Sequence, residues 1–179
     1  MRVLGVDPGS RKTGWGLVEE VGGDLRGLGS GVAQSGTGAV SVRLGRIAAR
    51  IDAILDEHRP DAVALERAFV GKNVSSALRL GEARGVILAS AGRRGLPVVD
   101  YPPATVKVAV AGAGAAEKAM VARGVSALLG LEMAAGDATD ALAVAICHLR
   151  HHRFEARLRS ATVVAAAPRR RVRVARGAR

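Results

Sequence analysis

The first 34 residues contain three strand-like runs in succession, and this feature constrains the fold more than any other. The runs cover 2–7, 13–20 and 25–34, the third is rich in glycine, and a Pro-Gly turn at Pro8 and Gly9 separates the first two. Two hairpins in succession predict a three-stranded antiparallel unit at the start of the chain.

After residue 34 the pattern changes to an alternation of helices and short apolar strands. Such alternation is typical of parallel strands joined by crossover helices. The expected elements are a helix from Val42 to Leu55 that Pro60 ends, a strand over 62–65 that leads into Glu66, a helix over 74–91, a strand over 97–101, and helices from about 115 to 129 and from 137 to about 152.

Three hairpin-linked strands followed by a strand–helix–strand–helix order and a closing helix is the order of the ribonuclease H-like fold. We therefore predict an α/β domain over residues 1–155, with a mixed five-stranded sheet flanked by helices. From Ala161 onward the chain turns to small residues and arginine without helical or strand periodicity. We predict a basic, disordered tail over 156–179.

The charge of the chain predicts a polyanionic partner. The formal net charge is +11, from 27 basic and 16 acidic residues. Residues 168–179 hold six arginines and no acid, which leaves +5 for the rest of the chain. Residues 1–167 therefore carry a net positive charge even without the arginines of 168–179.

The sequence gives no sign of a membrane segment or of an oxidising compartment. No uninterrupted apolar stretch reaches the roughly 18 residues that a spanning helix needs, and Met1 leads directly into a strand-like run. The single cysteine, Cys147, cannot form an intrachain disulfide. We expect a cytoplasmic protein without a membrane partner.

Four acidic residues stand at positions where the predicted fold brings side chains together. Asp7 ends the first strand and Glu66 ends the strand VALE, and parallel strands deliver their last residues to one crevice. Asp137 and Asp140 lie three apart, so they project from one face of a helix's first turn. The structural alternative is that Asp137 caps this helix and that Asp140 interacts with its dipole.

Convergence of four carboxylates favours a metal site over capping. The carboxylates would repel one another and raise their own pKa values unless a cation lay among them. Oxygen donors without histidine or cysteine suit magnesium or manganese and not zinc. Two such ions about 4 Å apart can stabilise both the attacking and the leaving oxygen of a phosphoryl displacement.

Four segments, in order and over the chain from Met1 to about His152, resemble the RuvC family of Holliday-junction resolvases: LGVDPGSRKTGWG, ALERAFVGKNVSSALRLGEARG, VKVAVAGAGAAEKAMV and GDATDALAVAICH. The resemblance implies a homodimeric endonuclease of DNA recombination and repair that cuts four-way junction DNA symmetrically and leaves 5′-phosphate and 3′-hydroxyl ends. It implies two Mg²⁺ ions per active site, with Mn²⁺ as a substitute, and suggests the RuvA–RuvB branch-migration complex as a partner.

The resemblance also implies roles for individual residues. Without it, a lone lysine belongs on a solvated face and a lone phenylalanine in the core. With it, the tetrad that binds the metals is Asp7, Glu66, Asp137 and Asp140, the basic residues that meet phosphate at the active site are Lys107 and Lys118, and the DNA-contacting loop contains Phe69, which stacks on a base, with Lys72 and Asn73 at its end.

The helix predicted over 74–91 carries a stripe of small residues at intervals of four: Ala77, Gly81, Gly85 and Ala89. Each glycine inside a helix costs roughly 1 kcal/mol relative to alanine, so another backbone is expected to come close. That backbone belongs either to the chain's own sheet or to a second copy at a homodimer interface.

Two other functions remain open from the sequence. One is a non-catalytic junction-binding protein, in which capping explains part of the acidic set. The other is an actin-like nucleotide-binding enzyme, in which DPGSRKTG is a phosphate-binding turn. The chain length disfavours it, because such enzymes close two lobes around the nucleotide and 179 residues allow barely one. The three histidines His148, His151 and His152 fall at helical spacings, and we expect them to face DNA or solvent and not a metal.

Overall fold

A computed structural model describes residues 1–67 and 74–166, the side chains of 161–166 excepted. Its five-stranded sheet has the order β3-β2-β1-β4-β5, with β1, β2 and β3 antiparallel and with β4 and β5 parallel to β1. Both predicted hairpins and the parallel half of the sheet are confirmed. The strands are β1 (Arg2–Asp7), β2 (Lys12–Val21), β3 (Asp24–Gln34), β4 (Ala62–Glu66) and β5 (Val98–Tyr101).

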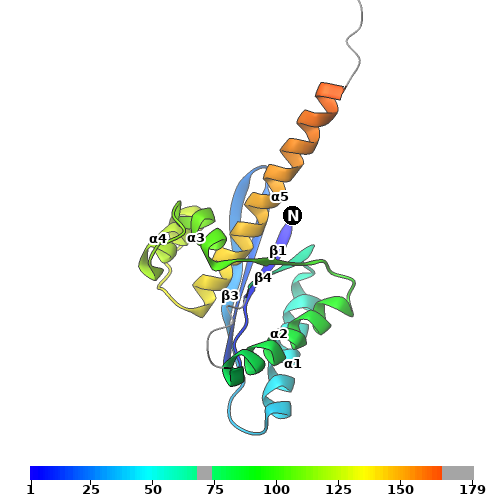
Figure 1. The fold of residues 1–179 in the computed structure, drawn as a ribbon, viewed down its shortest axis with the longest axis vertical. Coiled ribbons are helices and arrows are strands. Elements are labelled where there is room, and N and C mark those ends of the chain that lie inside the picture. Colours follow the sequence, from blue (N-terminus) through cyan, green and yellow to red (C-terminus); the bar gives the residue numbers. More distant parts are fainter. Residues whose placement is uncertain (68–73, 167–179) are drawn as a thin grey trace, which may run out of the picture.

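Helices cover both faces of the sheet (Figure 1). One face carries α1 and α2, and the other carries α3, α4 and α5. None of the helices in the described part of the chain has the length and apolar character to cross a membrane. The helices are α1 (Val40–His58), α2 (Val74–Gly92), α3 (Pro103–Ala111), α4 (Lys118–Leu129) and α5 (Asp137–Ala166).

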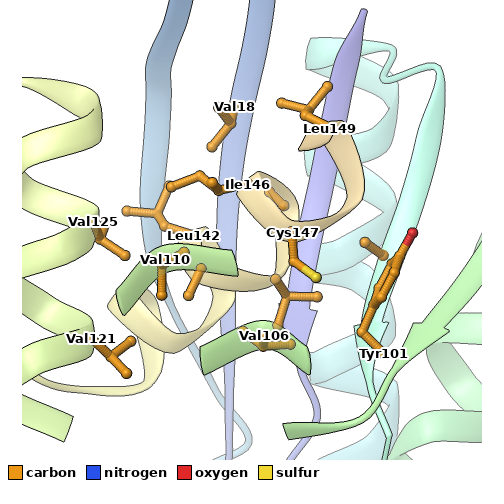
Figure 2. Packing of buried hydrophobic residues seen from close by; sticks show 14 of the residues in the cluster. Val18, Tyr101, Val106, Val110, Val121, Val125, Leu142, Ile146, Cys147 and Leu149 are labelled. Atoms are coloured by element: carbon orange, nitrogen blue, oxygen red, sulfur yellow. The ribbon is translucent and has the colours of Figure 1, made fainter. Parts of the chain in front are cut away.

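The two faces of the sheet bury separate aliphatic clusters, because successive strand residues point to opposite sides. Val3 belongs to the cluster under α5 and Leu4 to the cluster under α1. Figure 2 shows the α5 cluster, in which Leu142 and Ile146 lie among valines from β2, α3 and α4. Helix α5 is therefore the central helix of its layer.

Glycines in the sheet let α5 approach β1 and β2 at backbone distance. A Cβ atom added to Gly14 would lie 2.0 Å from the carbonyl oxygen of Asp137, and one added to Gly5 would lie 2.0 Å from that of Ala141. No side chain larger than hydrogen fits between these backbones. This contact fixes the first turn of α5, and with it Asp137 and Asp140, against the ends of β1 and β2.

The sequence did not predict α3, and the helix expected from about residue 115 begins at Lys118. The segment of α3 is rich in valine and threonine, which have low helix propensity. Proline at its first position suits a helix start, and Val106 and Val110 are buried in the α5 cluster. Tertiary packing therefore decides the helix here.

Helix α5 is longer than predicted, because it continues beyond His152 to Ala166. Residues 156–166, which the sequence analysis placed in a disordered tail, are helical, while 167–179 lie outside the described residues. Arginines with high helix propensity and an i,i+4 ion pair between Arg159 and Glu155 at 3.6 Å favour the extension. Figure 1 shows it projecting beyond the sheet.

The expectation for the first of the three histidines was wrong. His148 is buried, and its Nδ1 lies 3.0 Å from the hydroxyl oxygen of Tyr101 in a hydrogen bond. Burial lowers the pKa of His148, so its ring is neutral at physiological pH. His151 and His152 are exposed, as expected.

Candidate active site

Two of the predicted acids lie side by side at one edge of the sheet. Val6 of β1 pairs with Leu65 of β4, so Asp7 and Glu66 follow at the ends of neighbouring parallel strands. Both strands end here because a Pro-Gly turn follows Asp7 and the apolar run stops at Glu66. The third parallel strand, β5, ends beside them, since Glu66 pairs with Tyr101.

Helix α5 brings a third carboxylate to this edge. Asp140 lies in its first turn, and the carboxylates of Asp7, Glu66 and Asp140 line one cavity of about 180 Å³. Lys107 of α3 and Lys118 of α4 line the same cavity. The site therefore draws on two strands and three helices, and its residues are more than 130 positions apart in the chain.

The carboxylates destabilise one another's charges. Burial, followed by the charges of Glu66, Asp140 and Asp137, raises the pKa of Asp7 from 3.8 to about 7, although the Lys118 ammonium opposes this effect. Burial and the charge of Asp140 also raise the pKa of Glu66. When the carboxylates are ionised, the neighbouring lysines compensate their charge only in part.

Lys118 and Lys107 supply the positive charge of the site. The Lys118 ammonium donates a hydrogen bond to a carboxylate oxygen of Asp140 at 3.0 Å, and this bond raises the pKa of Lys118. The charges of Lys118 and then Lys107 counteract the rise in the pKa of Glu66. The Lys118 side chain is 73% exposed, so its ammonium can also reach a ligand in solvent.

The donor set fits a hard divalent cation. The cavity offers carboxylate oxygens without histidine or cysteine, which suits Mg²⁺ or Mn²⁺. The raised pKa of Asp7 shows that a further positive charge would be favourable. Over residues 1–67 and 74–166, no three acidic, histidine or cysteine side chains already surround a single point as metal ligands. The carboxylates line the cavity wall instead.

Both acids lie in the first turn of α5, where the helix dipole favours negative charge. Among the hydrogen bonds of the described residues, none runs from a backbone N–H to either carboxylate, and the Asp140 carboxylate accepts one from Lys118. Asp137 does not line the cavity, but its charge contributes to the raised pKa of Asp7. The structure therefore groups five of the predicted residues around one cavity and places Asp137 beside it. Phe69, Lys72 and Asn73 lie outside the described residues.

Sequence reasoning missed two arginines beside the acids. A second hollow of about 240 Å³ is lined by Asp7 and Glu66 together with Arg67 and Arg84. An ion pair of 2.6 Å with Asp100 of β5 holds Arg84 on α2 in this position. The contact joins two separate elements, so no local spacing in the sequence could have indicated it.

Comparisons with known proteins agree with this architecture. The family model described as "Crossover junction endodeoxyribonuclease RuvC" matches residues 3–148. The protein of that name from Chlorobaculum parvum is 49% identical over 152 residues, which is 83% of this chain and 81% of the relative. The one from Trichlorobacter lovleyi is 47% identical over 167 residues, 92% of this chain and 93% of the relative.

A solved structure is similar over nearly the whole folded part. The structure "T. thermophilus RuvC in complex with Holliday junction substrate" superposes with a TM-score of 0.82 at 37% identity. The match covers 87% of this chain and 96% of that chain. The ribonuclease H-like fold predicted from the order of strands and helices is thereby confirmed.

Proposed function

The chain belongs to the RuvC family of crossover junction endodeoxyribonucleases, and we propose that it resolves four-way DNA junctions by hydrolysis at the cavity lined by Asp7, Glu66 and Asp140. Relatives at 45–49% identity carry the endonuclease name, and a relative with the same fold was solved with a Holliday junction. The family match over residues 3–148 also decides against an actin-like nucleotide-binding enzyme.

The observation that carries this proposal is the concentration of half-buried carboxylates at one edge of the sheet in a protein that is basic as a whole. A binding surface for DNA gains nothing from carboxylates that repel both phosphate and one another. Desolvation and the neighbouring carboxylates raise the pKa of Asp7, and a bound cation would offset both effects. Asp7, Glu66, Asp137 and Asp140 would hold two Mg²⁺ ions, for which Mn²⁺ substitutes.

Bound cations would supply the charge neutralisation and water activation that phosphodiester hydrolysis needs. The chain's own contribution is to orient the reacting groups. Asp7 and Glu66 are fixed by the sheet, and Asp140 by the contact of α5 with Gly14. Lys107 and Lys118 line the same cavity and would hold the phosphate that is cut or its neighbour. Water attacks the phosphorus, and the products carry 5′-phosphate and 3′-hydroxyl ends.

The segment after β4 completes the DNA contact in this proposal. Phe69 stacks on a base near the crossover point, and Lys72 and Asn73 bind the backbone.

We also propose that the enzyme is a homodimer that joins through α2. A Cβ atom added to Gly81 or Gly85 would meet nothing within 4 Å, so the small-residue stripe does not pack on the chain's own sheet. Leu78 beside it is 65% exposed and Leu88 is 38% exposed. A twofold pair of α2 helices would cover this face and supply two active sites for two symmetric cuts.

The cellular setting follows from the same proposal. The substrate is chromosomal DNA, which together with the single buried thiol of Cys147 favours the cytoplasm and a role in recombination and repair. The RuvA–RuvB branch-migration complex would deliver junctions to the enzyme. Within the chain, the nuclease domain spans residues 1–155, and the basic residues beyond it add to DNA binding.

A cleavage assay tests the proposal. The full chain is incubated with a synthetic four-way junction and with a linear duplex of the same sequence, in Mg²⁺, Mn²⁺ or Ca²⁺. We expect paired cuts in the junction with Mg²⁺ and Mn²⁺ and no cuts in the duplex. Tight junction binding without any cut in Mg²⁺ or Mn²⁺ would favour the non-catalytic junction-binding protein instead.

A further inference from the structure

A second charged surface lies at the same edge of the sheet as the acidic cavity. A hollow of about 390 Å³ is lined by Arg11, Lys12 and Arg43, with Gln34 and Thr37 and two glycines completing the wall. None of these residues is acidic. We call it the basic hollow. Its residues belong to neither cavity that contains Asp7 and Glu66.

Strand register places the basic hollow relative to the acids. Asp7 pairs with Gly14 of β2, and Lys12 of β2 pairs with Gln34 of β3, so these strands end together. β3 lies two strand spacings from β1, which is about 10 Å. The rise of about 3.4 Å per nucleotide is measured along the DNA axis, and neighbouring phosphates of one strand lie farther apart than this, so about 10 Å corresponds to one to three nucleotides.

The wall of the basic hollow is held rigid by buried polar contacts. Ser35 is fully buried, its backbone N–H donates to the carbonyl oxygen of Arg11 at 3.0 Å, and its hydroxyl contacts the same oxygen at 3.1 Å. Arg43 donates to the Ser35 hydroxyl at 3.3 Å and to the carbonyl oxygen of Ser10. These bonds tie the β1–β2 turn to the end of β3 and to α1, so a ligand would meet a preformed site.

The cations of the basic hollow are available for a ligand. Arg11 and Lys12 are exposed, and no ion pair within the described residues engages Arg11, Lys12 or Arg43. Other arginines of the chain, such as Arg84 and Arg94, are paired with aspartates. The hollow thus concentrates positive charge that the fold itself leaves uncompensated, beside a site that acts on phosphodiesters.

We propose that the basic hollow binds a backbone phosphate of a junction arm one to three nucleotides from the phosphate that is cut. Arg11 and Lys12 would contact this phosphate, while Arg43 holds the wall against which it rests. The inference rests on the proposed function, because it takes the DNA in the acidic cavity as its point of reference. The contact would fix the direction in which the arm leaves the active site.

The test combines charge removal on the protein with charge removal on the DNA. Arg11→Ala/Lys12→Ala is compared with Arg26→Ala/Arg59→Ala, which removes the same charge from exposed positions at the opposite edge of the sheet. Junction affinity is measured without divalent cations over a range of salt. Each lost contact should weaken binding by about tenfold at 0.1 M salt and make the salt slope shallower by about 1, and the control should lose much less.

Neutral methylphosphonate groups then replace single phosphates one to four nucleotides from the cut. We expect one position at which the replacement weakens junction binding by the wild type and by the control variant but leaves binding by Arg11→Ala/Lys12→Ala unchanged. Two results would overturn the inference. One is that the two double variants bind the junction with equal affinity and equal salt slope. The other is that, at every position, the loss of affinity from the methylphosphonate simply adds to the loss from Arg11→Ala/Lys12→Ala. Arg11→Gln/Lys12→Gln repeats the test if the alanine variant unfolds early in a melting experiment.

The wild-type cleavage assay separates the two levels of this proposal. A wild type that cuts junctions in Mg²⁺ while the double variants behave alike contradicts the basic hollow alone. A wild type that binds but never cuts contradicts the proposed function, whatever the basic hollow does.

Discussion

Asp7 is the residue in which burial and charge conflict most strongly. It lies at the end of β1 beside Glu66. Because β1 is paired on both sides within the sheet, the Asp7 carboxylate cannot move away from Glu66. Its raised pKa means that the metal-free protein binds a proton there at pH values where a free aspartate is ionised. A proton and a divalent cation therefore compete for the same carboxylate.

Asp7→Asn should stabilise the metal-free protein at alkaline pH. The pKa of Asp7 is about 7 in the folded state against 3.8 for the free group, so the folded state binds more protons and loses stability as pH rises from about 4 to about 7. At about 1.4 kcal/mol per pKa unit, removing the charge gains up to about 4 kcal/mol at pH 8 and little at pH 4.

Denaturant unfolding in a chelating buffer at these two pH values measures the effect. Asp24→Asn, at an exposed position where β3 begins, is the control and should change stability little at either pH. An Asp7→Asn protein that is no more stable than the wild type at pH 8 would show that Asp7 carries no such electrostatic cost.

Individual site residues were predictable where a strand end or a helix start fixed them. Asp7, Glu66 and Asp140 were placed correctly, because the fold alone brings those positions together. The position of Asp137 off the cavity wall and the presence of Arg84 beside the acids were not predictable, whereas Arg67 directly follows Glu66 and was overlooked. The positions of Asp137 and Arg84 depend on side-chain direction and on contacts between separate elements, which local pattern does not encode.

Helix α5 owes its position to glycines in the strands beneath it. Gly14→Ala would place a methyl group 2.0 Å from the carbonyl oxygen of Asp137, so the first turn of the helix must shift. We predict a loss of stability of about 1 to 3 kcal/mol, as for other overpacked sites, and a larger loss of junction cutting. Misplacement of Asp140 by about 1 Å can lower the rate on the order of a hundredfold.

The control for this change is Gly45→Ala on α1, where a Cβ atom meets nothing and the helix should gain about 1 kcal/mol. Unfolding midpoints and single-turnover cutting rates are compared for both variants. A Gly14→Ala protein with wild-type stability and rate would mean that α5 does not rest on this contact.

Gly85→Leu should convert the dimer to a monomer if α2 pairs with its twin. The position faces open space in one chain, so leucine costs the monomer nothing and raises helix propensity by about 1 kcal/mol. At a closely packed helix pair the same side chain keeps the two backbones apart. Gly45→Leu on α1 meets equally open space and is the matched control.

Sedimentation velocity and a two-cut junction assay provide the readouts for this pair of variants. We expect Gly85→Leu to sediment as a monomer and to lose paired cutting, while Gly45→Leu remains dimeric. A dimeric Gly85→Leu protein with normal paired cutting would place the interface elsewhere.

Elements with strong periodicity or clear stop signals were predicted within a few residues. These include the three opening strands and α1, which ends at His58 before Pro60. Helix α3 was missed because its valines favour a strand and only burial against α5 makes it helical. The end of α5 was predicted too early. The residues after His152 lack apolar periodicity, and this was interpreted as the end of the helix.

The molecule as a whole separates its active edge from its basic C-terminus. Asp137 and Asp140 open α5, and the helix then runs across the sheet and beyond it (Figure 1). Its 30 residues correspond to about 45 Å at 1.5 Å per residue. Basic residues near the far end of this helix can strengthen DNA binding, but they lie far from the acidic cavity.

Deletion of 168–179 should therefore weaken junction binding without abolishing cleavage. Six arginines are lost, so the dependence of affinity on salt should become shallower. Filter binding and cutting are measured from low to physiological salt, with substitution of the same six arginines by glutamine to separate charge from length. Complete loss of cutting at low salt by a folded deletion protein would show that these residues belong to the active structure.

In the proposed function the acidic cluster performs the cut while other surfaces bind the DNA. Asp140→Asn keeps the size of the side chain and one oxygen but removes the charge that, with Asp7, would hold the cations. The cutting rate of the purified, folded variant on a four-way junction in Mg²⁺, measured beside its junction affinity, is the most direct test. We predict no detectable cutting with affinity equal to or tighter than wild type. Cutting at the wild-type rate would contradict the claim, because asparagine could replace Asp140 only in a capping role.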